Sequence, residues 1–143
     1  MTSDLRDLAR RLLAHEAHGS QERDAWVDAA NGVCQRLHDH LARLIGPAGV
    51  LALLGRAMAL ERTESPFLST VRVEANGRLS GLREAIQEEE DSRVSAGLAA
   101  VLANFLWLLV TFVGEDLTLR LVSQVWPDAP LRASGPGSEE DIP

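Results

Sequence analysis

The sequence predicts an all-α protein, a compact bundle of about five or six helices around a central apolar helix at about residues 92–114. Two observations lead to this fold class. The run from Ala96 to Gly114 passes nineteen residues without a charge, and earlier segments repeat apolar residues at the three- and four-residue spacing of amphipathic helices. A helix that is apolar on every side needs other helices to cover it, and helices with one apolar face need an apolar partner.

Two helices are expected before residue 46. In the first, apolar residues recur at i, i+3, i+4, i+7 and i+8 until Gly19 ends it. These residues are Leu5, Leu8, Ala9, Leu12 and Leu13. Ser20 is expected to cap a second helix that runs to about Ile45. Its core-facing stripe is Trp26, Ala30, Val33, Leu37, Leu41 and Leu44, and its opposite face carries Asp28, Gln35, Asp39 and Arg43.

A third helix is predicted from Ala48 to Arg62, because Pro47 is tolerated at a first helical position. Small residues give this helix a flat side that another backbone can approach closely. They are Gly49, Ala52, Gly55 and Ala59. The third helix is therefore expected to contact the helix of residues 96–114.

The segment after Ser65-Pro66 changes character. Apolar residues alternate around Asn76-Gly77, a dipeptide that favours a tight turn, so a minimal hairpin is expected near residues 71–79. Ser80 is expected to cap a short helix that leads into a solvated acidic run at residues 88–91. Ser92 then opens the central helix, which pauses at Gly114 before a last helix that stops ahead of Pro127.

Length and composition limit the domain organisation. A chain of 143 residues has the size of one domain. Residues 1–127 are expected to form this single helical domain. Residues 128–143 form an acidic segment rich in Pro, Gly and Ser that cannot bury enough apolar area to order itself, so we expect a disordered tail.

Charge and residue usage exclude several functions. All fourteen basic residues are arginine, and there is no lysine or tyrosine, which excludes Schiff-base chemistry, a phosphate-binding loop lysine and a tyrosine acid or base. A net charge of −7 repels phosphate backbones, so no nucleic-acid partner is expected. The single cysteine and the absence of a secretory signal pattern at the N-terminus predict a cytoplasmic protein.

No motif predicts a catalytic residue, a cofactor or a metal site. Cys34 and His38 have the i, i+4 spacing of zinc ligands, but two ligands do not close a site and no CxxC or HExxH motif is present. Cys34 is therefore interpreted as a small buried hydrophobe. No Ser-His-Asp spacing or glycine-rich phosphate loop is recognisable either.

Two groups of polar residues are candidate sites. His38 and His40 point to different helix faces, and an exposed histidine on a helical bundle is what phosphotransfer domains present. The segment from His40 to Arg43 resembles their His-x-Leu-Lys pattern, with arginine in place of lysine and without the small residue that follows. A solvated surface histidine is the favoured interpretation, and phosphotransfer is the alternative.

The second group is a polar cluster beside the core, formed by Glu115, Asp116 and Arg120. One carboxylate is expected to cap the last helix while Arg120, about a turn further on, pairs with the other. The functional alternative is a partly desolvated carboxylate that transfers a proton.

The apolar run of residues 96–114 is also long enough to span a bilayer, which takes roughly 17–25 residues. Its flanks lack the excess of basic residues that fixes membrane orientation. Asn104 in its middle would be costly in lipid but is readily satisfied by a neighbouring helix. The core interpretation is therefore preferred, with an amide of Asn104 that bonds to another helix.

A strong core without recognisable chemistry predicts a non-enzymatic helical domain with a regulatory or adaptor role that binds a protein partner. Trp26, Trp107 and Trp126, together with the small-residue faces, exceed what one bundle must bury, so a homo-oligomer such as a homodimer is expected. Two alternatives stay open. They are a membrane-associating helical hairpin, and a histidine phosphotransfer or small-ligand-binding domain.

Overall fold

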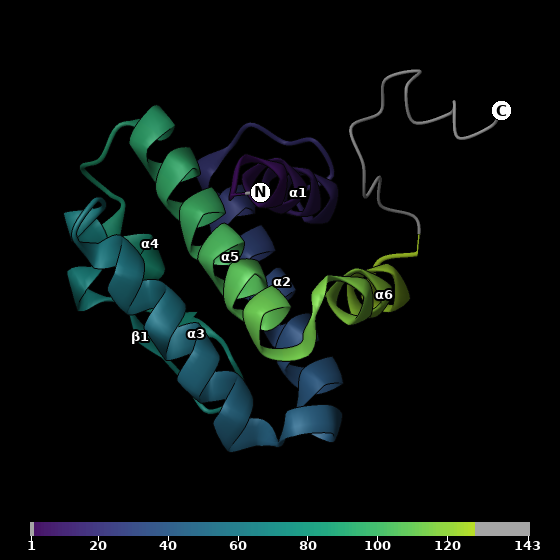
Figure 1. Cartoon of the computed structure of the whole chain (residues 1–143). Coiled ribbons are helices and arrows are strands. Elements are labelled where there is room, and N and C mark those ends of the chain that lie inside the picture. Colours follow the sequence, from purple (N-terminus) through teal and green to yellow (C-terminus); the bar gives the residue numbers. More distant parts are fainter. Residues whose placement is uncertain (1, 128–143) are drawn as a thin grey trace, which may run out of the picture.

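A computed structural model describes residues 2–127, so the predicted tail at 128–143 lies outside the described residues. Six helices pack against one another there, which confirms the all-α bundle (Figure 1). They are α1 (Thr2–Glu16), α2 (Arg23–Ile45), α3 (Pro47–Arg62), α4 (Leu82–Ala85), α5 (Asp91–Val113) and α6 (Glu115–Val125). A short 3-10 helix, η1 (Pro66–Thr70), and two strands, β1 (Arg72–Val73) and β2 (Leu79–Ser80), lie between α3 and α4.

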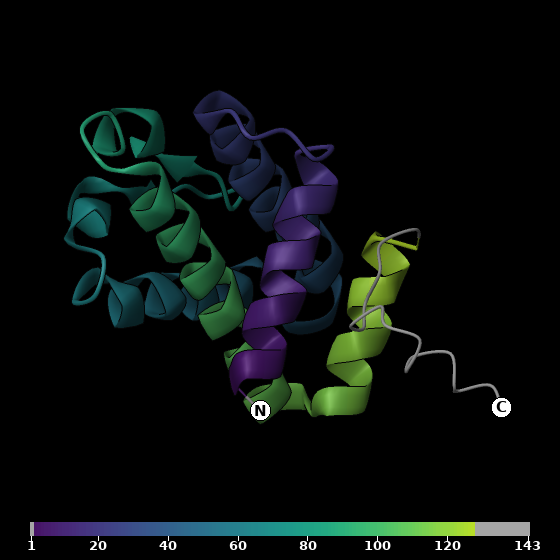
Figure 2. The same ribbon diagram turned by 90° about the horizontal axis from the view of Figure 1, so that it is seen from above.

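Helix α5 is the centre of the bundle, as predicted. It packs most extensively against α3 and α1, which flank it in Figures 1 and 2. Helix α5 is also long and apolar enough to cross a membrane, but 56% of its most apolar window is buried inside the fold. Its buried residues are Val94, Gly97, Leu98, Ala99, Ala100, Val101, Leu102, Ala103, Phe105, Leu106 and Leu109.

The minimal hairpin predicted near residues 71–79 is also confirmed. Strands β1 and β2 pair antiparallel, with Arg72 opposite Ser80 and Val73 opposite Leu79. Gly77 in the turn has a φ of +91°, and a Cβ there would lie 2.9 Å from Cβ of His38 and 3.0 Å from the carbonyl oxygen of Cys34. Glycine is therefore required both by the backbone conformation and by the close approach of the turn to α2.

The predicted starts of two helices are wrong by a few residues. Helix α2 begins at Arg23 rather than directly after Ser20, and the Ser20 hydroxyl accepts a hydrogen bond from the backbone N–H of Glu22 inside the connecting loop. Helix α4 follows Gly81, whose φ of +82° is left-handed, while Ser80 belongs to β2. Ser20 thus serves the turn before its helix, a role that serine adopts as readily as capping, and Ser80 serves the strand pair before its helix.

Two expectations about helix faces are wrong as well. Leu44 is 56% exposed because the last turn of α2 extends beyond the core. The small residues of α3 do not face α5, since Ala52 and Ala59 are exposed and a Cβ at Gly55 would meet nothing within 4 Å. Helix α3 instead buries its larger side chains, which removes more apolar area from water. They are Val50, Leu54 and Met58, and the small Ala57 is buried among them.

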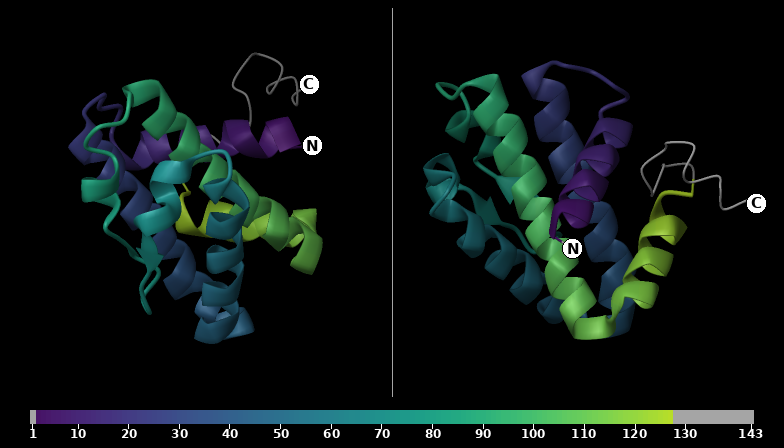
Figure 3. Two further views of the ribbon diagram at one scale, coloured as in Figure 1. Left: turned by 90° about the vertical axis from the view of Figure 1, so that its left-hand side faces the viewer. Right: turned by 45° about the horizontal axis from the view of Figure 1, so that its top comes forward.

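Helix α6 folds back beside the bundle after Gly114, whose φ is +97°, so α5 and α6 form a V (Figure 3, right). The end of α6 is fixed by Trp126, which is only 3% exposed. Its indole N–H donates to Oε1 of Glu16 at 3.0 Å, and Nε of Arg36 lies 3.0 Å from Oε2 of the same carboxylate. Glu16 thus joins α1, α2 and the end of α6.

Candidate interaction surface

The predicted hydrogen bond of Asn104 is present and lies where α3 and α5 meet. Its Nδ2 donates to the carbonyl oxygen of Ala57 at 3.3 Å. Near the other end of this contact, a Cβ at Gly97 would lie 3.0 Å from the Ser65 hydroxyl oxygen. Higher numbers on one helix thus meet lower numbers on the other, so α3 and α5 run antiparallel, as Figure 1 shows.

Two large apolar side chains border this contact and remain exposed. Leu60 follows Ala57 by three residues and is 47% exposed, and Trp107 follows Asn104 by three residues and is 42% exposed. Residues three apart on a helix lie on the same side, so both side chains lie next to the hydrogen bond. We call the surface formed by Leu60, Trp107 and the exposed small residues Ala52 and Ala59 the α3–α5 face.

The α3–α5 face is nearly free of charge. Between Pro47 and Leu60 the only charged residue is Arg56, and between Val94 and Val113 there is none. The rest of the chain carries a net charge of −8, because Arg56 contributes +1 to the total of −7. Exposed apolar groups on helix segments with so few charges are typical of a surface that is covered by a partner.

Two further exposed apolar side chains lie at another end of the molecule. Leu44 is in the last turn of α2, and Phe112, 65% exposed, is in the last turn of α5. These two helix ends lie close to the start of α3 in Figure 1. They are separate from the hydrogen bond between α3 and α5.

The three tryptophans behave differently from one another. Trp126 is buried, and Trp26 is half-buried with its indole N–H donating to the carbonyl oxygen of Ser20 at 3.0 Å. The bundle therefore covers two of the three rings, more than the sequence led us to expect. Trp107 alone among them is left as an exposed candidate contact.

The candidate phosphoacceptors occupy different environments, in agreement with their expected opposite faces. His38 is 9% exposed; its Nδ1 lies 3.4 Å from Oδ1 of Asp39, and its Nε2 is buried without a hydrogen-bond partner. His40 is half-buried, with Nε2 3.2 Å from Oε1 of Gln124 on α6. A phosphoryl group would need the bundle to open before it could reach His38.

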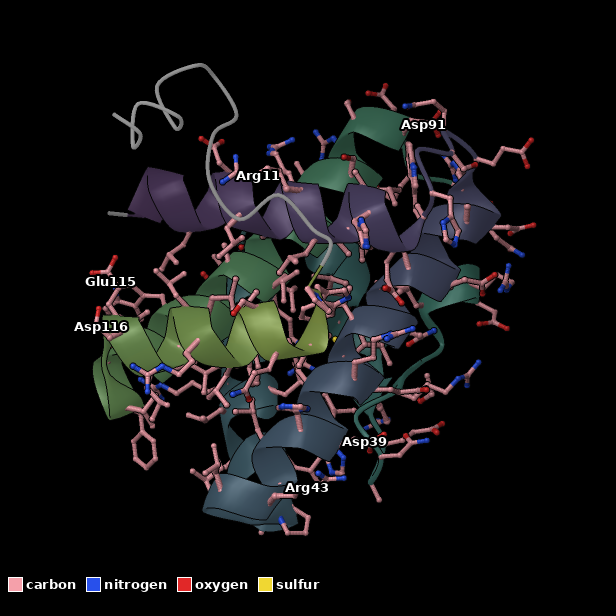
Figure 4. All side chains as sticks on the ribbon, turned by 90° about the vertical axis from the view of Figure 1, so that its right-hand side faces the viewer. Arg11, Asp39, Arg43, Asp91, Glu115 and Asp116 are labelled. Carbon is pink, nitrogen blue, oxygen red and sulfur yellow. The ribbon has the colours of Figure 1, made fainter. Side chains whose placement is uncertain are left out.

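The residues of the predicted polar cluster lie in the first two turns of α6. Glu115 and Asp116 are exposed in the first turn of α6, where Figure 4 shows them pointing away from the bundle. Within the described part of the chain, no ion pair joins Arg120 to either carboxylate. At the start of α6, the hydroxyl of the buried Thr118 instead donates to the carbonyl oxygen of Gly114 at 2.8 Å.

Figure 4 also shows Asp39 and Arg43 on the outer side of α2, as predicted.

Cys34 lies on α2, and its side chain is buried in the hydrophobic core of the bundle. Burial raises the pKa of its thiol to about 12, so the thiol is protonated at neutral pH and is not a nucleophile there. Among residues 2–127, no group of three or more His, Cys, Asp or Glu side chains is placed to hold a metal ion.

No protein-family model, curated protein or solved structure matches the chain.

Proposed function

We propose that this chain is a non-enzymatic interaction domain that pairs with a second copy of itself through the α3–α5 face. The observation that carries the proposal is the exposure of Leu60 and Trp107 beside the contact of two helix segments whose only charged residue is Arg56. A regulatory or adaptor role, in a cytoplasmic setting, is the function that such a domain would serve.

A second copy is the occupant that the charge distribution favours. Two chains of net charge −7 repel each other, and the repulsion is smallest where neither brings charge to the contact. On α3 the face brings one charge, the exposed Arg56 between Ala52 and Leu60, and its sign is opposite to the net charge of the chain.

The shape of the face also suits self-pairing. Trp107 is a large projecting ring, while Ala52, Gly55 and Ala59 leave the outer side of α3 flat. In a two-fold dimer the same patch is used on both copies, so each Trp107 ring can pack on the flat side of the partner's α3.

The oligomeric state tests this proposal directly. Size-exclusion chromatography with light scattering should give a mass near 31 kDa, which is twice the chain mass of 15.5 kDa. The variants Trp107→Glu and Ala59→Arg should each shift the protein to a monomer, because both place a charge in the contact. Leu44→Ser, which removes an exposed leucine outside the α3–α5 face, should remain dimeric.

A monomeric wild-type protein at about 100 µM, a concentration above the dissociation constant of most specific dimers, would contradict the proposal. So would a dimer that Leu44→Ser disrupts and Trp107→Glu does not. Circular dichroism must show that each variant retains its helix content, so that a loss of mass is not caused by unfolding.

The alternative function is membrane insertion of α5, and a variant at Asn104 tests it. Asn104→Leu removes the hydrogen bond to Ala57, so in a bundle it should lower the free energy of unfolding by about 1 kcal/mol. If α5 instead faced lipid, the same change should increase recovery with phospholipid vesicles. Thermal unfolding and vesicle sedimentation of this variant, compared with the unmodified protein, separate the two functions. Unchanged stability with greater vesicle binding would favour insertion.

A further inference from the structure

A cleft of about 460 Å³ lies where the end of α3 and the start of α5 meet the first helix. Arg6, Glu61, Glu64, Ser65, Phe67 and Arg93 are among the residues that line it. Its volume falls within the range of about 300–1,000 Å³ that is usual for small-molecule sites. In Figure 1 the end of α3 and the start of α5 lie at the same end of the antiparallel pair, opposite the turn that joins α5 to α6.

Glu61 is a buried carboxylate without a cationic partner in this cleft. It is 8% exposed, and its Oε2 accepts a hydrogen bond from the Ser65 hydroxyl at 2.8 Å. Among the described residues, no arginine or histidine forms an ion pair with it. Glu61 also lies one residue from the end of α3, where the helix dipole disfavours negative charge. A buried charge with these surroundings is costly unless a cation approaches it.

Two arginines line the same cleft from other helices. Arg6 on α1 and Arg93 on α5 are both exposed, and neither forms an ion pair within the described part of the chain. A guanidinium group offers paired N–H donors that match the two oxygens of a carboxylate. The cleft therefore presents to a ligand two carboxylates, the buried Glu61 and the exposed Glu64, and two arginines without an ion pair in the described residues.

Phe67 gives the cleft an apolar wall. The ring lies so close to α5 that a Cβ at Gly97 would be 2.8 Å from its Cζ, and the same Cβ would be 3.0 Å from the Ser65 hydroxyl oxygen. Glycine at position 97 thus allows Phe67 and Ser65 to rest against α5. This contact fixes the wall beside Glu61.

We propose that the cleft binds a small zwitterion of the α-amino acid class that has an apolar side chain. The ammonium group of the ligand binds the Glu61 carboxylate, its carboxylate binds Arg6 and Arg93, and its side chain packs on Phe67. This site uses residues other than Leu60 and Trp107, so the test of ligand binding is independent of the test of self-association.

Thermal unfolding in the presence of each standard L-amino acid at 10 mM tests the proposal. At least one amino acid with an apolar side chain should raise the melting temperature in a saturable way, because a ligand that binds only the folded state stabilises it. The analogues that lack one charge should bind at least tenfold more weakly in calorimetric titration. For L-phenylalanine these analogues are 2-phenylethylamine, which keeps only the ammonium, and 3-phenylpropanoate, which keeps only the carboxylate.

Variants then assign the binding to the cleft. Glu61→Gln keeps the shape of the side chain and should weaken binding at least tenfold, and Arg93→Gln should do the same from the exposed side of the cleft. Glu115→Gln removes an exposed carboxylate on α6 and should leave binding unchanged. If Glu61→Gln does not fold, Arg93→Gln provides the test, because the Arg93 side chain is exposed and its replacement does not disturb the core.

Three results would overturn the proposal. They are no rise in melting temperature with any L-amino acid at 10 mM, equal binding of the amino acid and its single-charge analogues, and binding that Arg93→Gln leaves intact.

Discussion

Replacing Phe105 with alanine is expected to lower the free energy of unfolding by about 3–5 kcal/mol. Phe105 is 1% exposed and is one of the largest fully buried side chains of the bundle. Removing the ring forfeits its transfer free energy and leaves a cavity, because the helices around α5 can relax only in part. Denaturant unfolding followed by circular dichroism measures the difference between the two proteins.

Phe112→Ala is the matched control on the same helix. Phe112 is 65% exposed, so its loss should change the free energy of unfolding by less than about 1 kcal/mol. Both variants remove a phenylalanine ring from α5, so the difference between their losses of unfolding free energy reports only how deeply each position is buried. Similar losses for Phe105→Ala and Phe112→Ala would show that α5 is not packed as a central helix.

The fold follows closely from the sequence where apolar periodicity and turn residues agree. The uncharged run of α5, the restart of the chain at Pro47 and the Asn76-Gly77 turn each predict an element that the structure contains. Leu44 shows the limit of this reasoning. Its spacing places it on the core side of α2, but spacing does not tell where the neighbouring helices stop, so the last turn is left uncovered.

Helix starts are harder to predict because several residues near each start can serve as caps. Ser20 and Ser80 both have hydroxyl groups suited to capping, yet each is used in the turn or strand that precedes its helix. The prediction that α3 packs on its neighbour through its small residues was wrong for a different reason. Both a flat side and a side with larger apolar residues can pack on a neighbour, and the second buries more area.

The candidate surfaces depend on contacts between distant residues, which a single sequence does not reveal. Glu61 and Ser65 have the i, i+4 spacing of a local hydrogen bond, and a carboxylate near a helix end that disfavours it is a signal that could have been noticed. The arginines that share its cleft come from α1 and α5, and no local pattern brings them there. The exposure of Trp107 is likewise a result of the antiparallel packing of α3 and α5.

Trp126→Ala is expected to lower the free energy of unfolding by about 3 kcal/mol or more. The ring is 3% exposed, and its N–H is bonded to Oε1 of Glu16 at 3.0 Å. Trp126→Phe keeps much of the apolar contact and loses the hydrogen bond to a charged acceptor, so it should cost about 1–3 kcal/mol. Trp107→Ala, which truncates a ring that is 42% exposed, is the control and should cost less than either.

The loss at Trp126 should begin locally, because the Trp126 side chain holds the end of α6 to α1. The hydrogen bond between Thr118 and Gly114 lies within the first turn of α6 itself, whereas the bond between Trp126 and Glu16 joins the end of α6 to α1. Without the indole ring, hydrogen exchange of the amides in α6 should accelerate while the amides of α5 around Phe105 stay protected. Equal acceleration in α5 and α6 would contradict this, since it would mean that the bundle opens as one unit and that α6 has no separate attachment.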